Sequence, residues 1–343
     1  MNSSLLLHFR PRRLPEPALR FSLTFGLGGT ATLLIMVQFF TGLLLRFAYE
    51  PRPVAAFHSV QHISSEMFFG PLIRNLHHWA GHLLIVVIIC HFLRIFYQGA
   101  YTGKRWGNWL VGLGLGILVC LANFSGYLLP WDQLSYWAVT IATNMLAYLP
   151  FVGPALHDSI LAGAKVDGAT LLLFYNFHTA ILPLLLLVAM AYHFWLVRKA
   201  GGVSVGERSE GGGPKVPAGP HLFTRELAMA ALVLALLMLG AILLDAPLLA
   251  MANPELTPEI IRAPWYFVGF QELLLHIPPA AAWVLLIGVT VFCAALPFMV
   301  VEQKKSPKVI RLLMGLLLLS YGLLTLLGCF LRGPGMTLIL PWH

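Results

Sequence analysis

The chain has 343 residues, of which 58% are hydrophobic and only 10% are charged, and its mean hydropathy is +0.79. A soluble domain carries about a quarter charged residues, so this composition excludes a water-soluble enzyme, and the high hydrophobicity excludes a disordered chain. The apolar runs are continuous, whereas the strands of an outer-membrane barrel alternate polar and apolar residues. The composition therefore predicts an all-α, polytopic membrane protein. The net charge of +8 then indicates basic cytoplasmic loops rather than nucleic-acid binding.

A membrane-spanning helix needs roughly 20 mostly apolar residues, and seven stretches of the chain meet this requirement. The four that precede residue 200 are predicted to form an N-terminal four-helix bundle. The predicted spans are 23–47, 74–98, 108–129, 169–197, 225–246, 280–301 and 309–331.

The apolar region 136–152 is a possible eighth span. With seven spans, 16 of the 22 Lys and Arg residues lie on the side of the N-terminus and six on the other side. An eighth span would move the basic segment 198–225 across the membrane and break this asymmetry. We therefore predict short interfacial helices over 136–152. The asymmetry also predicts that the N-terminus lies in the cytoplasm of a bacterial-type inner membrane. The first apolar run is too long for the apolar part of a cleaved signal peptide, so we expect it to remain as a span.

A linker divides the chain. Ala200 to Pro220 contains seven glycines and three prolines, which is the composition of a flexible connector. We predict a four-helix domain over 1–199, a linker over 200–221 and a three-helix domain over 222–343.

Two of the predicted spans each carry a pair of widely spaced histidines. His77 and His91 are 14 residues apart, and His178 and His193 are 15 apart. At about 1.5 Å and 100° per residue, each pair returns to nearly the same helix face after roughly 21 to 22 Å, and Pro183 could absorb the one-residue mismatch by a kink. Two facing His–His couples at two depths suit two iron porphyrins, each with histidine on both faces. Metal ions alone are the main alternative.

Glycines repeat the same spacing on the other two helices of the bundle. Gly28 and Gly42 are 14 apart, as are Gly112 and Gly126. Ordinary close packing of membrane helices also uses small residues, but the shared period with the histidines favours clearance for a flat macrocycle. The four cysteines all lie in apolar runs and form no C-x-x-C-H motif, so the sequence predicts no covalent haem of that kind.

Several long motifs carry a family resemblance. They are "LIRNLHHWAGHLLIVVIICHFLRIFYQG", "GYLLPWDQLSYWAVTIATN" and "FYNFHTAILPLLLLVAMAYHFWLVRKAGG". They resemble cytochrome b of the quinol-oxidising bc complexes, and most closely the b6 type of the b6f complex. The part after the linker resembles subunit IV of that complex, here joined to the b6-like part in one polypeptide.

The resemblance implies an outer haem b held by His77 and His178 and an inner haem b held by His91 and His193. It implies that Arg74 pairs with a haem propionate, and it places a quinone site near Arg198. It also implies a dimeric complex containing a Rieske iron–sulfur protein or a cytochrome c. The b6 type binds an additional covalent haem through a cysteine at the position of Leu34, so no covalent haem is expected here.

The outer quinol site departs from the family. The family motif is Pro-Glu-Trp-Tyr, whereas this chain has Ala263-Pro264-Trp265-Tyr266. Pro264 cannot accept a quinol proton as that glutamate does. Glu272 is a possible substitute, with Tyr136 and Tyr266 as weaker candidates; the alternative is that Glu272 is an ordinary interfacial carboxylate.

Two functions remain open from the sequence. The first is a quinol-oxidising subunit with a site between 126–158 and 262–276. The second is a transmembrane haem conduit or anchor in a complex with multihaem cytochromes. A substrate transporter fits poorly, because it would leave the histidine pairs unexplained and the chain lacks an inverted repeat.

Overall fold

The computed structural model describes residues 13–15, 25–202, 215–259, 261–301 and 307–331. The regular elements of these residues are helices, apart from two three-residue strands, β1 (Arg13–Pro15) and β2 (Lys215–Pro217), which pair antiparallel. Among the described residues, seven helical segments are long and apolar enough to cross a membrane, which confirms the predicted number. They are Leu27–Arg46, Gly70–Tyr97, Gly103–Tyr127, Gly168–Lys199, Leu222–Leu243, Pro279–Met299 and Lys308–Phe330.

The region predicted to be interfacial is helical but contains no further span. It forms α7 (Gln133–Leu146) and α8 (Gly153–Leu161), of 14 and 9 residues. Both are too short to cross a bilayer, which takes roughly 20 residues. The described residues therefore bear out seven spans rather than eight.

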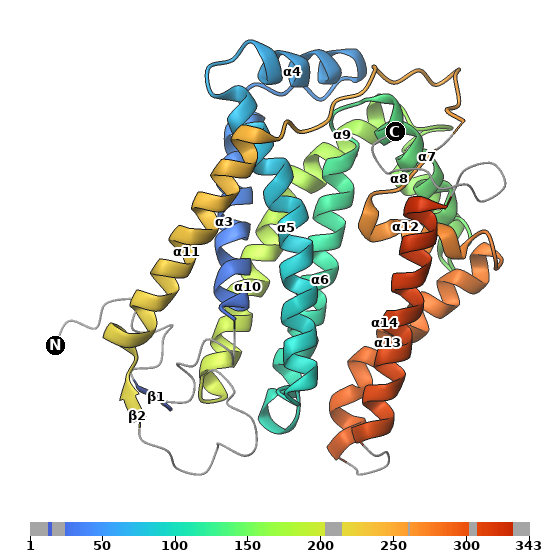
Figure 1. Cartoon of the computed structure of the whole chain (residues 1–343). Helices are drawn as coiled ribbons and strands as arrows, with labels where there is room; N and C mark the ends of the chain where they lie inside the picture. Colours follow the sequence, from blue (N-terminus) through green and yellow to red (C-terminus); the bar gives the residue numbers. More distant parts are fainter. Residues whose placement is uncertain (1–12, 16–24, 203–214, 260, 302–306, 332–343) are drawn as a thin grey trace. The chain divides into compact units, whose positions relative to one another are not determined.

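The first of two compact units contains the histidine-bearing helices. Helices α3 and α5 lie side by side, and α11 packs against both (Figure 1). Asn75 on α5 is buried and makes three hydrogen bonds to the last turn of α11 and the residues just after it. Its Nδ2 donates to the carbonyl of Ala241 and to Oδ1 of Asp245, and its Oδ1 accepts from the N–H of Ala246. The helices of this unit are α3 (Leu27–Arg46), α4 (Pro53–Ser65, of which the first five residues belong to the second unit), α5 (Gly70–Tyr97), the short η2 (Gly103–Arg105), α6 (Trp106–Tyr127, of which Tyr127 belongs to the second unit), η3 (Phe177–Ile181), α10 (Leu182–Lys199) and α11 (Ala218–Leu243).

The compact units do not follow the linker. Helix α11 follows the linker in sequence but belongs to the unit of the first four spans, because Asn75, Arg74 and Trp79 of α5 all donate hydrogen bonds to its C-terminal end or to the residues just after it. Residues 203–214 of the linker lie outside the described residues. Helix α11 begins at Ala218, seven residues before the start of the predicted span.

The second compact unit joins the segment after α6 to the C-terminal helices. Asp132 caps α7, since its Oδ1 accepts from the N–H of Ser135 at 2.9 Å, and its Oδ2 accepts from the N–H of Leu249 at 3.2 Å. The Gln133 side chain bonds to the backbone of Asn253 and Leu256. The Pro-Trp-Asp-Gln motif thus anchors a loop more than a hundred residues further along the chain. The helices are α7, α8, α9 (Gly168–Asn176, of which Asn176 belongs to the first unit), α12 (Trp265–Leu273), α13 (Pro279–Val301) and α14 (Pro307–Phe330).

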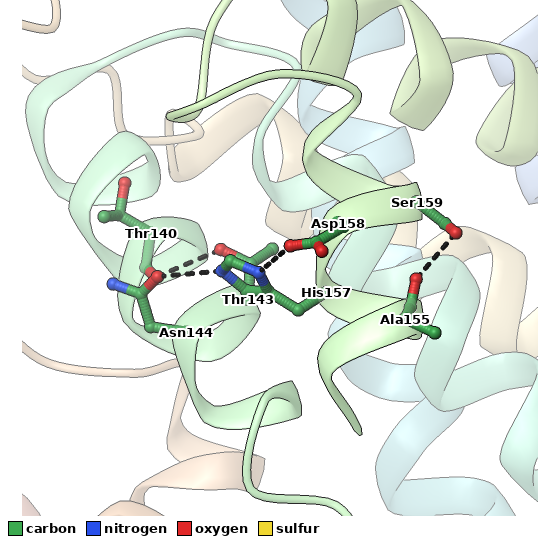
Figure 2. A network of polar contacts seen from close by, with 7 residues as sticks. All are labelled: Thr140, Thr143, Asn144, Ala155, His157, Asp158 and Ser159. Carbon is green, nitrogen blue, oxygen red and sulfur yellow. Dashed lines mark hydrogen bonds and ion pairs between the residues drawn. The ribbon is translucent and has the colours of Figure 1, made fainter. Parts of the chain in front are cut away.

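A polar contact joins α7 to α8. Figure 2 shows the imidazole of His157 between Asn144 of α7 and its neighbour Asp158. Its Nε2 lies 3.3 Å from the Asn144 amide oxygen, and its Nδ1 lies 3.0 Å from the Asp158 carboxylate. Asp158 is exposed, so solvent screens this pair and its contribution to stability is small.

Replacing Asp132 by alanine is expected to destabilise the second unit. The change removes the cap of α7 and the acceptor for the N–H of Leu249, and the two losses together amount to about 1–3 kcal/mol. The measurement is the unfolding midpoint of the purified protein in detergent, followed by circular dichroism. Asp158→Ala, at an exposed carboxylate, is the matched control. An equal midpoint for both variants would contradict the anchoring role of Asp132.

Candidate haem and quinol sites

Two of the predicted ligands face one another in the first unit. The ring centres of His77 and His178 are 6.1 Å apart, and the ring planes are at 80° to each other. Two imidazoles that bind one metal ion from opposite sides have ring centres about 6 Å apart, since each metal–nitrogen bond is about 2.0 Å long. The second pair, His91 and His193, is close enough for electrostatic interaction. The structure thus brings the four histidines together in the predicted couples.

A π-helical turn resolves the mismatch between the 14- and 15-residue spacings. Residues Phe177–Ile181 form one π turn, closed by a hydrogen bond from the N–H of Leu182 to the carbonyl of Phe177. A π turn accommodates one extra residue in the helix. It contains His178 and ends two residues before Pro183, which has no N–H for the regular ladder. The 15-residue interval on this span therefore matches the 14-residue interval on α5.

Each of the four predicted glycines lies against the imidazole of one histidine. A Cβ built on Gly42 would lie 3.1 Å from Cε1 of His77, and one on Gly126 would lie only 2.5 Å from Cε1 of His178. Gly28 and Gly112 make the equivalent approaches to His91 and His193, both at 3.5 Å. The described contact is thus with the ligand ring, and glycine lets that ring lie against the backbone of the neighbouring helix.

Hydrogen bonds orient the outer pair of rings. Nδ1 of His178 donates to the carbonyl of Ala122 at 2.9 Å and lies 3.2 Å from the Ser125 hydroxyl. Nδ1 of His77 lies 2.9 Å from the Thr41 hydroxyl. A hydrogen bond at Nδ1 leaves Nε2 free to bind a metal and sets the ring's tautomer.

The sequence analysis missed Thr41 and Ser125. Each stands directly before one of the outer glycines, Gly42 and Gly126. A hydroxyl residue followed by glycine at matched positions of two helices was the available signal. Gln38 was missed as well, and its Nε2 donates to the carbonyl of His77 at 2.7 Å.

The two predicted arginines lie near opposite ends of the first unit's spans. Arg74 near the start of α5 donates to the carbonyls of Ala246 and Pro247. Arg198 is exposed at the C-terminal end of α10. Arg105, which the sequence analysis did not single out, donates to the carbonyls of Ala200 and Gly202 just beyond that end.

The second unit holds Tyr266 and Glu272 on the short helix α12. Glu272 is buried, with 8% of its surface exposed. The carbonyl of Tyr266 accepts a hydrogen bond from the Tyr321 hydroxyl. Gln271 holds the backbone of residues 261–263 by two hydrogen bonds. Its amide oxygen accepts from the N–H of Ala263, and its amide nitrogen donates to the carbonyl of Ile261. The helix that follows the altered motif is therefore held at a defined position.

This unit also holds Tyr136, which the sequence offers as a weaker candidate together with Tyr266, and Arg262, which was not expected. Tyr136 on α7 is buried, and burial raises the pKa of its phenol above the ordinary value, which keeps it protonated. Arg262 directly precedes the Ala263-Pro264-Trp265-Tyr266 motif, and its three guanidinium nitrogens are buried and form no hydrogen bond with any part of the chain that the structure describes.

The described residues include no group of three or more His, Cys, Asp or Glu side chains that could hold a metal ion. Facing pairs of two histidines suit a metal that brings its remaining ligands with it, as haem iron does.

Comparison with known proteins agrees with this geometry. The sequence profile of the family "Cytochrome b/b6/petB" matches residues 14–201, and that of "Cytochrome b(C-terminal)/b6/petD" matches 251–340. The chain belongs to the cytochrome b family. It is therefore an integral membrane protein and a cytochrome b6-like subunit of a bc or b6f type of complex, a family that binds haem b.

Individual relatives cover either part or nearly all of the chain. It is 42% identical to cytochrome b6 of Heliomicrobium gestii over 187 residues, which is 54% of this chain and 88% of the relative. It is 38% identical to cytochrome b6 of Prochlorothrix hollandica over 175 residues, which is 51% of this chain and 79% of the relative. A chain of the solved "Hyperthermophilic respiratory Complex III" is similar in structure, with a TM-score of 0.78, 28% identity, and coverage of 91% of this chain and 85% of that one.

Replacing Gly126 by alanine is expected to displace the His178 ring, because the added Cβ would lie 2.5 Å from it and a packed site cannot absorb such an overlap without shifting. The haem content per polypeptide of the purified protein should therefore fall. Gly114→Ala on the same helix, where nothing lies within 4 Å of the added Cβ, is the control. Equal haem content in both variants would show that Gly126 is not needed for clearance.

Proposed function

We propose that this chain is the dihaem cytochrome b subunit of a membrane quinol-oxidising complex and that it passes electrons across the membrane. The observation that carries the proposal is the facing pair His77 and His178, 6.1 Å apart, with a glycine behind each ring. The similarity to cytochrome b6 and to a respiratory Complex III supports it.

Two non-covalent b haems are proposed, each held by one residue of α5 and one of the span that contains η3 and α10. His77 and His178 hold the outer haem, and His91 and His193 hold the inner one. When bound, the haems supply a route for electrons between the two membrane faces. Arg74 is proposed to pair with a propionate of the outer haem. Leu34, which is fully buried on α3, occupies the place of the family's haem-binding cysteine, so no covalent haem is proposed.

The wider arrangement follows from the charge asymmetry and from the family. We place the chain in a bacterial-type inner membrane with its N-terminus in the cytoplasm. Its partners would be a Rieske iron–sulfur protein or a cytochrome c, in a dimeric complex with quinol and quinone as substrates. The inner quinone site is assigned to the region of Arg198. The halves 1–199 and 222–343, joined by 200–221, would correspond to the b6 and subunit IV chains of the b6f type.

The outer quinol site is proposed between 126–158 and 262–276, which both lie in the second unit apart from residue 126. Trp283 on α13 bridges the two segments, since its indole donates to the carbonyl of Met145 on α7 and its ring packs against Phe270 on α12. Glu272 takes the role of proton acceptor, with Tyr266 on the same helix, α12, as the weaker candidate. A carboxylate is the better base here, because a phenol has a reference pKa near 10.

A second candidate function is a transmembrane haem conduit in a complex with multihaem cytochromes. Pro264 in place of the family's glutamate favours it. The composition of the purified complex discriminates between the two functions: an iron–sulfur signal in electron paramagnetic resonance supports quinol oxidation with a Rieske partner, and covalent haem on co-purifying subunits supports the conduit.

The proposed haem pairing predicts matched losses. His77→Ala and His178→Ala should remove the same haem, and His91→Ala and His193→Ala should remove the other, because each haem needs both axial ligands. Optical redox titration of membranes from each variant identifies the haem that is lost. Loss of the same haem from the His77 and His193 variants would refute the pairing.

The proposed proton acceptor predicts a slow variant with intact haems. Glu272→Gln keeps the size of the side chain but cannot accept a proton, so quinol oxidation should slow by about 10- to 100-fold. The assay is quinol-driven haem reduction in membranes, with haem content checked by difference spectra. Glu259→Gln, at an exposed glutamate of the same unit, is the control. Unchanged rates for Glu272→Gln at full haem content would eliminate this role.

A further inference from the structure

We propose that His276 receives the proton taken up by Glu272 and releases it to water, so that the two residues form a proton relay. This inference rests on the proposed oxidation of quinol in the second unit. It adds a residue that the family motif does not contain, because His276 lies ten residues beyond Tyr266.

The pair joins a buried group to an exposed one. Nε2 of His276 lies 3.5 Å from Oε1 of Glu272. The Glu272 side chain is 10% exposed, whereas the His276 side chain is 53% exposed. A proton on the carboxyl group can therefore reach solvent through the imidazole, which presents one nitrogen to the carboxylate and carries a second one to hand the proton on.

The backbone fixes both ends of this pair. Glu272 is near the end of α12, and the N–H of His276 donates to the carbonyl of Leu273 in the turn that follows. One helical turn separates the two residues, a spacing at which side chains meet. His276 also lies three residues before the span that begins at Pro279. It is therefore just outside the membrane-spanning segment, where water can reach its ring.

Close packing on α14 holds Glu272 in place. A Cβ on Gly328 would lie 3.4 Å from Cβ of Glu272 and 2.8 Å from Cγ1 of Val268. A Cβ on Gly269 would lie 2.5 Å from the Thr325 hydroxyl. Glycines at both contacts let the two helices approach closely, so the carboxyl group has a defined position from which to accept and pass on a proton.

The proton balance of the relay is complete. The Glu272 carboxylate accepts a proton from the quinol hydroxyl as that O–H bond breaks, while the electrons leave to the acceptors of the proposed complex. The carboxylic acid then protonates Nε2 of neutral His276, and the imidazolium loses a proton from Nδ1 to water. Glu272 returns to the carboxylate, and His276 is left neutral with its proton on Nε2. Exchange of the exposed ring's protons with water then returns the proton to Nδ1, so that Nε2 can accept the next one. An imidazole suits this step because its reference pKa is near 6.5.

The chain offers a matched control. His62 and Glu66 form a second His–Glu pair four residues apart, with Nδ1 of His62 at 2.7 Å from the carboxylate. The imidazole is 53% exposed, as in His276, but Glu66 is 69% exposed rather than buried. Replacing His62 removes an imidazole of equal exposure from a pair that has no buried carboxyl group to serve.

The experiment measures quinol-driven haem reduction in membranes that contain the whole complex, with His276→Ala, His62→Ala and Glu272→Gln compared at equal haem content. We expect His276→Ala to slow the reaction about tenfold, less than the loss of a group that exchanges a proton with substrate directly, and His62→Ala to leave it unchanged. Added imidazole should restore most of the rate of His276→Ala, because the lost ring is exposed, and should not restore Glu272→Gln.

The possible results separate the relay from the proposed function. A wild-type rate for His276→Ala beside a slow Glu272→Gln would overturn the relay and leave Glu272 as the proton acceptor. A slow His276→Ala that imidazole does not restore would assign His276 a structural role and also overturn the relay. Wild-type rates for both variants would remove Glu272 from the outer site and the relay with it.

Discussion

The first compact unit depends on imidazole pairs inside a membrane. A polar ring in the bilayer is costly unless a partner satisfies it, and His77 and His178 meet this condition with a hydrogen bond at Nδ1 and with the opposite ring facing across the bundle. Glycines on α3 and α6 follow from the same condition, because the rings lie against the backbone of these helices. The close approach of the helices and the proposed haem sites therefore depend on the same contacts between imidazole rings and glycines.

The second unit depends on side chains that hold irregular backbone near the membrane. Its loops are outside the spans and cannot satisfy their N–H and C=O groups through helical bonds. The side chains of Asp132 and Gln133 form hydrogen bonds to the backbone of the loop 249–256, and the side chain of Gln271 forms hydrogen bonds to the backbone before α12. These bonds place α7 and α12 in one unit around the proposed quinol site. Pro264 has no N–H to donate, and its carbonyl accepts hydrogen bonds from the N–H groups of Phe267 and Val268 at the start of α12. Proline at this position therefore keeps the start of the helix while it removes the family's carboxylate.

Some residues of the candidate sites could be predicted from the sequence and others could not. The four histidines could be found because a 14-residue interval returns to the same helix face, and the glycines because they repeat that interval. Thr41 and Ser125 were not assigned, although each precedes a glycine of the repeat, since a hydroxyl in a span most often bonds to its own helix. His276 could not be linked to Glu272 until the burial of the carboxylate was known, because a His–Glu pair four residues apart also occurs at the exposed positions 62 and 66.

The sequence by itself determined the membrane class, the number of spans and the two levels of histidine pairs, because each depends on composition or on the period of a helix. The tertiary structure decided the π turn at Phe177–Ile181, the placement of α11 with α5, and the anchoring of residues 249–256 by the Pro-Trp-Asp-Gln motif. These features depend on contacts with other helices, most of them between residues far apart in the chain, and no local pattern of residue types specifies such contacts.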